Sequence, residues 1–112
     1  MRLEQTALPG DILMVKLTGA LDIAAAGEID MSFSVICGKY NKVIVNLADV
    51  TFLASIGIRV LVKAAQAIGR RSGRLVVCNP TQEARKVLRS TGIDAIIPVV
   101  ADEEAAIAEC SK

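Results

Sequence analysis

Ser55 is the residue in this sequence whose type and position most clearly point to chemistry. It follows an apolar run at 43–47 and the segment 49–52, and a helical pattern begins directly after it at Ile56. A hydroxyl at a strand-to-helix junction lies at a helix N-terminus, where unpaired backbone N–H groups and the helix dipole favour negative charge. The sequence contains no histidine to act as a base, so this site is better suited to carrying a phosphate than to catalysis.

Enzymatic alternatives lack the residues that they require. A serine hydrolase needs a base beside its hydroxyl, and no lysine is placed near Ser55 to replace the missing histidine. The phosphate-binding pattern G-x-x-x-x-G-K-[ST] is absent. A phosphoaspartate receiver domain would use Asp49 as its acceptor, but it also needs an acidic pair after its first strand, and positions 17–19 carry no carboxylate. The sequence therefore predicts a protein that is not an enzyme.

Two further polar residues precede Ser55. Asp49 is predicted to structure the turn at 49–52 by accepting backbone N–H bonds, and Thr51 is predicted to be structural. Ser55 itself has a structural alternative, because serine is a common N-cap residue. From the residues alone, a helix cap and a phosphate acceptor both remain open.

Composition and charge narrow the class of protein. The 112 residues suit one domain, and 53% are hydrophobic while only 3% are aromatic, which favours a sheet covered by helices over an aromatic-rich sandwich. The formal net charge of +1 gives no indication of binding to nucleic acid or to an anionic membrane. No segment has the length needed to cross a bilayer, and no signal segment precedes the domain, so we expect a cytoplasmic protein.

The three cysteines, Cys37, Cys78 and Cys110, are far apart and form no C-x-x-C pair. Without histidine, zinc and haem sites are improbable, and nothing in the sequence calls for a cofactor. We expect these residues to be small apolar side chains in a reducing compartment.

The elements that would position Ser55 follow from periodicity and cap signals. Strands are expected over 2–8, 12–17, about 42–47, 74–78 and 96–100, with a turn at 9–11. Four helices are expected. The first begins after a cap at Asp22 and ends at about 38, and the second runs from Ser55 to about 70. The third begins after a cap at Asn79, with Pro80 and Gln82 in its first turn, and the fourth begins after a cap at Asp102. The order β-β-α-β-α-β-α-β-α predicts an α/β fold with a mixed sheet of about five strands, an N-terminal antiparallel hairpin, parallel crossovers and about four helices.

Residues 49–57, DVTFLASIG, resemble the signature of the bacterial anti-sigma factor antagonists, the STAS-domain family. Its typical form is Asp-hydrophobic-Ser/Thr, an apolar or aromatic pair, and then Asp-Ser-x-Gly. The resemblance extends through 79–80 and 91–92, so it covers nearly the whole chain and implies a single STAS-like domain over 1–112.

In that family a partner-switching serine kinase, often itself the anti-sigma factor, phosphorylates the motif serine, and a PP2C-type phosphatase removes the phosphate. The resemblance implies that Ser55 is the phosphate acceptor, with Thr51 as a second candidate, and that the unphosphorylated protein binds the kinase. Ala54 stands where the family usually has aspartate. The acceptor remains, and the loss of a neighbouring carboxylate should ease the arrival of a phosphate.

A phosphate on Ser55 would act mainly on binding. It adds roughly −1.5 to −2 charge, which a helix N-terminus tolerates, and Arg59 at i+4 is expected to lean toward it. In a docked complex the same charge would be desolvated or would meet like charge on the partner. We therefore expect the phosphate to prevent partner binding without changing the fold.

The helix after Ser55 is expected to provide the partner surface. One face, with Ile58 and Leu61 at its centre, is predicted to be buried against the sheet. Ile56 and Val60 on the other side are predicted to be partly exposed and to form the apolar centre of the interface. The remaining expected contacts are Gly57, Arg59, Lys63 and Ala64. The structural alternative is that this side packs against a loop or the first helix.

A second function remains open within the resemblance. Some single-domain STAS proteins are accessory subunits of transporter ATPases or of signalling complexes without a sigma factor. Under that hypothesis Ser55 acts mainly as a helix cap and contact residue. In either case the expected partners are proteins.

Overall fold

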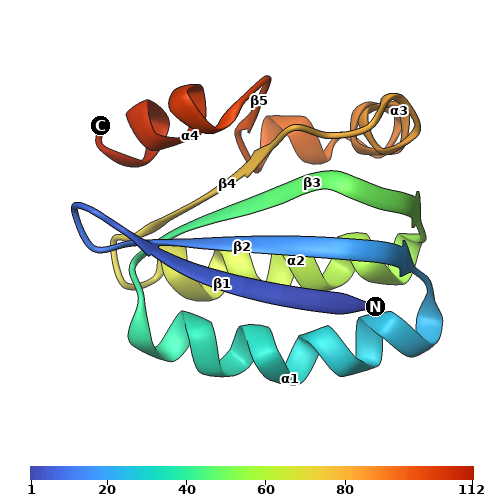
Figure 1. Ribbon diagram of the computed structural model, residues 1–112, viewed down its shortest axis with the longest axis horizontal. Helices are drawn as coiled ribbons and strands as arrows, with labels where there is room; N and C mark the ends of the chain where they lie inside the picture. Colours follow the sequence, from blue (N-terminus) through green and yellow to red (C-terminus); the bar gives the residue numbers. More distant parts are fainter.

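The fold is built on one five-stranded sheet whose strands lie in chain order, as the computed structural model of residues 1–112 shows (Figure 1). The strands are β1 (Arg2–Leu8), β2 (Ile12–Leu21), β3 (Lys42–Leu53), β4 (Arg74–Cys78) and β5 (Val99–Val100). The first two strands form an antiparallel hairpin, and the neighbours from β2 to β5 are parallel. The predicted mixed sheet is confirmed.

Four α-helices cover the two faces of this sheet. They are α1 (Ile23–Lys39), α2 (Ser55–Gly69), α3 (Gln82–Ser90) and α4 (Glu103–Cys110), and a short 3-10 helix spans Ile93–Ala95. Figure 1 shows α1 and α2 on one side of the sheet and α3 and α4 on the other. Alternate side chains of the central strands point to opposite faces, so β3 buries Val43 and Val45 with the larger core cluster and Ile44 with the cluster that includes α4 residues.

Two of the predicted helix caps are confirmed. Asp22 accepts a hydrogen bond of 2.9 Å from the Ala25 N–H, and Asp102 accepts one of 2.8 Å from the Ala105 N–H. These carboxylates satisfy backbone donors that the first helical turn leaves unpaired.

The predicted cap of α3 is wrong. Thr81 is the N-cap, and its hydroxyl accepts a hydrogen bond of 3.1 Å from the Ala84 N–H, so Gln82 is the first helical residue. Asn79 has a positive φ of 52° and ends β4 instead. Asparagine is one of the few residues other than glycine that adopt this left-handed conformation readily, although the Oδ1 atom of Asn79 is buried without a hydrogen-bond partner.

The central strands are longer than their apolar runs predicted. The parallel pairing of β2 with β3 continues to Leu21 opposite Leu53, so positions 49–52 belong to a strand and not to a turn. The expected strand at 96–100 is reduced to β5, with the 3-10 helix before it. Pro98 has no N–H to donate to a ladder, although its carbonyl accepts a bond of 2.9 Å from the Val77 N–H.

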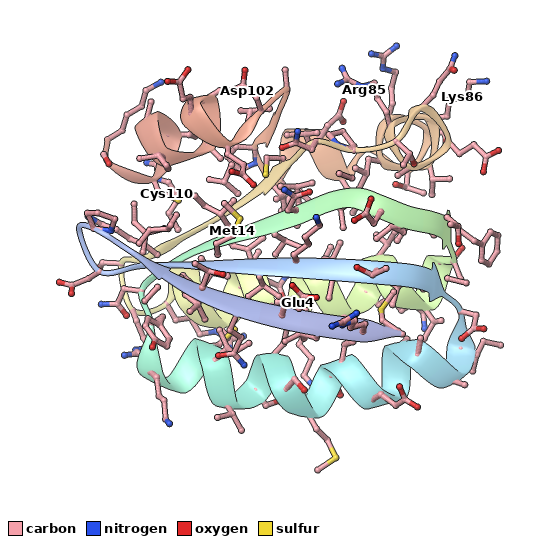
Figure 2. All side chains as sticks on the ribbon, in the orientation of Figure 1. Glu4, Met14, Arg85, Lys86, Asp102 and Cys110 are labelled. Carbon is pink, nitrogen blue, oxygen red and sulfur yellow. The ribbon has the colours of Figure 1, made fainter.

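All three cysteines are buried free thiols, as predicted. Cys78 and Cys110 lie between the sheet and α4, where Figure 2 shows Cys110 near Met14. Burial, with the nearby carboxylates of Glu103 and Asp102 adding to it, raises the pKa of the Cys78 thiol to about 12. Burial also raises the pKa of Cys110, to about 11. Both thiols therefore keep their protons in the folded protein at pH values where an unfolded chain would lose them.

We expect these two thiols to make the protein sensitive to alkali. The ordinary pKa is 9.0, so above this pH the unfolded chain binds fewer protons than the folded protein and stability falls as pH rises. Between about pH 8 and about pH 10 the free energy of unfolding should drop by about 2–3 kcal/mol. Urea unfolding at both pH values measures this drop. A Cys78→Ala/Cys110→Ala variant, less stable at the lower pH, should lose most of the pH dependence, and an undiminished slope in that variant would contradict the assignment.

Candidate functional site

Ser55 is the first residue of α2, and its side chain is exposed. The N-cap position belongs to Ala54, which has extended φ and ψ angles of −82° and 159° and no side-chain capping bond. The interpretation of Ser55 as a helix cap is therefore wrong. Its hydroxyl makes no hydrogen bond within the protein and stands beside the backbone donors of the first turn of α2. A phosphate on this oxygen would lie where the helix dipole favours negative charge.

The parallel pairing of β2 and β3 explains which segments surround Ser55. The carboxyl ends of parallel neighbours meet at the same edge of a sheet, and here each strand leads directly into a helix. The Ala54 N–H donates a hydrogen bond of 3.0 Å to the Leu21 carbonyl, which ties the two strand ends together. The N-termini of α1 and α2 consequently lie side by side.

A shallow hollow of about 360 Å³ joins these two helix starts. Its lining residues are Ile23, Ala54, Ser55, Ile56 and Arg59. Ile23 is 78% exposed, which is unusual for an isoleucine, and Ile56 is half-buried. The predicted partial exposure of Ile56 is confirmed. The sequence does not predict Ile23 as part of this site, because only the pairing of β2 with β3 in the folded protein brings it close to Ser55.

The predicted exposure of Val60 is wrong, and Ala64, an expected partner contact, is not available at the surface either. Val60 is only 7% exposed and Ala64 is also buried. The two line a groove with Phe33 and Cys37 of α1, so the side of α2 that was expected to face a partner packs against the first helix. A helix that contacts both a sheet and another helix has an apolar arc wider than one stripe. The structural alternative left open for this face is the correct one.

Gly57 is buried as well and cannot be a contact at the surface. A Cβ atom at this position would lie 2.5 Å from Leu21 Cγ and 2.8 Å from Leu21 Cδ2. Glycine therefore lets the start of α2 pack directly onto the end of β2. Packing therefore explains why glycine occupies this position of the signature. The close approach of α2 to β2 holds Ser55 near the edge of the sheet.

The two basic residues of α2 are exposed, as expected. Lys63 forms an ion pair with Asp30 of α1, with an Nζ–Oδ1 distance of 3.4 Å. Arg59 has no carboxylate partner within the protein and lines the same hollow as Ser55. Its guanidinium is therefore free to pair with an anion at Ser55 or with a carboxylate of another protein.

Asp49 does not structure a turn, and this prediction is wrong. It lies in β3, is exposed, and pairs with Lys16 of β2 at an Oδ2–Nζ distance of 3.1 Å. The cross-strand ion pair is available because the strands continue past their apolar runs. Thr51 is also an exposed residue of β3, but it lines a different hollow, together with Thr81 and Gln82. The structure therefore separates Thr51 from the hollow around Ser55.

Two other kinds of site are not found. No three cysteine, aspartate and glutamate side chains are grouped so that they could hold a metal ion. None of the helices combines the length and the apolar composition that a membrane crossing requires.

Comparison with known proteins places these features in a family. The STAS domain model matches residues 5–106. BtrV of Bordetella bronchiseptica, whose name describes it as a candidate anti-sigma factor antagonist, is 28% identical over 109 residues, which cover 96% of this chain and 93% of that protein. The chain belongs to the STAS domain family.

Solved structures agree with the fold. A candidate anti-sigma factor antagonist of Thermotoga maritima has a TM-score of 0.91 at 22% identity, over 98% of this chain and 95% of that chain. The anti-sigma factor antagonist SpoIIAA in its unphosphorylated form has a TM-score of 0.82 at 23% identity, over 96% and 95%. Phosphorylated SpoIIAA from Bacillus has a TM-score of 0.75 at 24% identity, over 96% and 98%.

Proposed function

We propose that this protein is a non-catalytic switch whose binding to a protein partner is controlled by phosphorylation of Ser55. The unphosphorylated form binds a serine kinase of the anti-sigma factor type. A phosphate on Ser55 blocks that binding, and a PP2C-type phosphatase restores it. The protein acts in the cytoplasm of a bacterium and regulates transcription through this partner.

The observation that carries the proposal is the free, exposed hydroxyl of Ser55 inside an apolar hollow. A kinase can reach this oxygen, since no other side chain covers it. Ile23 and Ile56 beside it give a partner apolar surface to bury, and Arg59 offers a charge at the rim. The relatives support the proposal, because BtrV is named for antagonism of an anti-sigma factor and SpoIIAA has been solved with and without its phosphate.

A phosphate would change binding more than it would change the fold. At the first residue of α2 the added charge lies beside unpaired N–H groups, and Arg59 is one turn away. In a complex the same charge would be buried against Ile23 and Ile56 without water, which is costly unless the partner supplies a cation. Ala54 places no carboxylate next to the acceptor, so nothing in the adjacent residue opposes phosphorylation.

Mass spectrometry of the protein purified from its host tests the acceptor. We expect one phosphate, located on Ser55, and none in a Ser55→Ala variant expressed in the same way. Thr51 is the internal comparison, because it is an exposed hydroxyl only a few residues away in the same tryptic peptide. A phosphate found on Thr51 and absent from Ser55 would contradict the proposal.

A further inference from the structure

The second half of β3 contains two more residues than the part of β2 with which it pairs. Residues 46–53 of β3 lie opposite residues 16–21 of β2, so seven steps along one strand accompany five along the other. The pairing shifts once after Lys16 and once after Gly19. Each shift is a β-bulge, in which an extra residue bends the strand and redirects the side chains that follow it. The path of β3 to Ser55 therefore depends on two bulges.

The first bulge determines which side chains of β3 face the core between the sheet and α2. Side chains of a regular strand alternate between the two faces, as those of residues 43–47 do. After the bulge, Val50 is buried in the larger core cluster, while Asp49 is exposed and pairs with Lys16. Without the extra residue, Asp49 would face the core and Val50 would face away, because a shift of one residue reverses every later side chain. The segment that leads to Ser55 would be reversed with them.

Asn46 holds the first bulge in place. It is only 4% exposed and is the one polar side chain among the buried residues. Its Oδ1 atom accepts a hydrogen bond of 2.9 Å from the Ala48 N–H, which lies within the bulge. Its Nδ2 atom donates a hydrogen bond of 3.0 Å to Glu103 Oε1, in the first turn of α4. An amide is needed here, because one partner requires an acceptor and the other requires a donor.

We propose that Asn46 is a positioning residue for Ser55, and that Glu103 couples the start of α4 to the same bulge. The bond to Ala48 keeps the extra residue in β3, and the bond to Glu103 fixes the orientation of the amide that makes it. The functional part of this inference rests on the proposed role of Ser55 in partner binding. The coupling itself concerns only the geometry of the free protein.

The coupling runs through the sheet from one face to the other. Figure 1 shows α4 and α2 on opposite sides of the strands. No residue of α4 lines the hollow at Ser55, so Glu103 acts on that site through β3 and not by contact. The last step is the hydrogen bond of 3.0 Å from the Ala54 N–H to the Leu21 carbonyl, which forms only while the end of β3 keeps its register beside β2. A change at Glu103 should therefore be detected at Ala48 and at Ala54.

Two substitutions in the first turn of α4 test the coupling. Glu103→Ala removes the acceptor of the Asn46 amide, and Glu104→Ala removes the neighbouring carboxylate, which is exposed and makes no hydrogen bond to the sheet. Both variants lose a similar interaction with the helix dipole, so the difference between them reports the bond to Asn46. We expect the amides of Ala48 and Ala54 to exchange hydrogen about fivefold faster in Glu103→Ala than in Glu104→Ala, with equal rates in β4.

A paired substitution tests the role of the amide itself. Asn46→Asp keeps an acceptor for the Ala48 N–H, but at about pH 8 it brings a second carboxylate against Glu103 without a donor between them. Adding Glu103→Gln to that variant supplies the donor from α4. We expect faster exchange at Ala48 and Ala54 in the single variant and rates close to those of the wild type in the double variant. A mere loss of packing at position 46 would not be restored by a change on α4.

Affinity for the co-purified partner tests the link to function. We expect Glu103→Ala to bind about tenfold more weakly than Glu104→Ala, although neither residue lines the hollow at Ser55. Equal exchange at Ala48 and Ala54 in these two variants, or no recovery in the double variant, would overturn the coupling. Equal affinities would overturn the positioning role. A wild-type protein that carries no phosphate on Ser55 would contradict the proposed function alone, because the exchange rates are measured on the free protein.

Discussion

Ser55→Glu is expected to lower the affinity of the protein for its partner by about a hundredfold or more, which corresponds to at least about 2.7 kcal/mol. The carboxylate would lie in the hollow between Ile23 and Ile56, where docking removes water from it. Desolvating a charge costs several kcal/mol unless it is fully paired, and we expect that Arg59 alone does not offset this cost once the partner has displaced the water. Titration calorimetry with the partner that co-purifies with the unphosphorylated protein measures the loss.

Ser55→Gln is the matched control for charge. It has nearly the shape of glutamate but no charge, so we expect it to retain binding within about tenfold of the wild type, whereas the glutamate variant fails. The glutamate variant should also be as stable as the wild type or more stable by about 0.3–1 kcal/mol, because a carboxylate at the start of α2 interacts favourably with the helix dipole. Equal weakening by both substitutions would mean that size and not charge matters at this position.

Gly73→Ala is expected to destabilise the fold by about 3 kcal/mol. Gly73 connects α2 to β4, and a Cβ atom there would overlap the Asn41 carbonyl oxygen in the connection between α1 and β3. That oxygen accepts a hydrogen bond of 2.7 Å from the Arg74 N–H, so it cannot move away without breaking a bond between the two connections. Ile68, which is fully buried, closes the space on the other side. Urea unfolding of the variant measures the loss.

Gly69→Ala provides the comparison for that measurement. Gly69 is the last residue of α2, and nothing lies within 4 Å of its Cβ position. Because alanine favours a helix over glycine, this substitution should leave the stability unchanged or raise it by up to about 1 kcal/mol. Equal free energies of unfolding for the two variants would contradict the close packing described at Gly73.

The order of elements could be predicted from the sequence because it depends on local patterns. The continuous apolar runs of β3 and β4 and the helical spacing of Ile29, Phe33 and Ile36 are each visible within a short window. The ends of elements depend on partners. β3 continues through Asp49 only because β2 lies alongside it, and Thr81 caps α3 because Asn79 takes a left-handed conformation.

The candidate site was predictable in part for the same reason. The position of Ser55 at the start of α2 follows from the adjacent strand and helix patterns, and Ile56 is half-buried, in agreement with its predicted partial exposure. The burial of Val60 and the exposure of Ile23 depend on how α1 packs against α2 and on which helix ends meet at the edge of the sheet. The residues that neighbour Val60 and Ile23 in the sequence give no signal of either packing arrangement.

The most direct measurement compares two forms of the same chain, one carrying phosphoserine incorporated at position 55 and one unmodified. Their affinities for the co-purified partner are measured together with the amide NMR spectra of the two free proteins. We predict that the phosphorylated form binds at least about a hundredfold more weakly, and that its spectrum changes only around the start of α2 and the neighbouring end of β2. Equal affinities of the two forms, or loss of binding accompanied by spectral changes across the whole sheet, would contradict a switch that acts through the surface at Ser55.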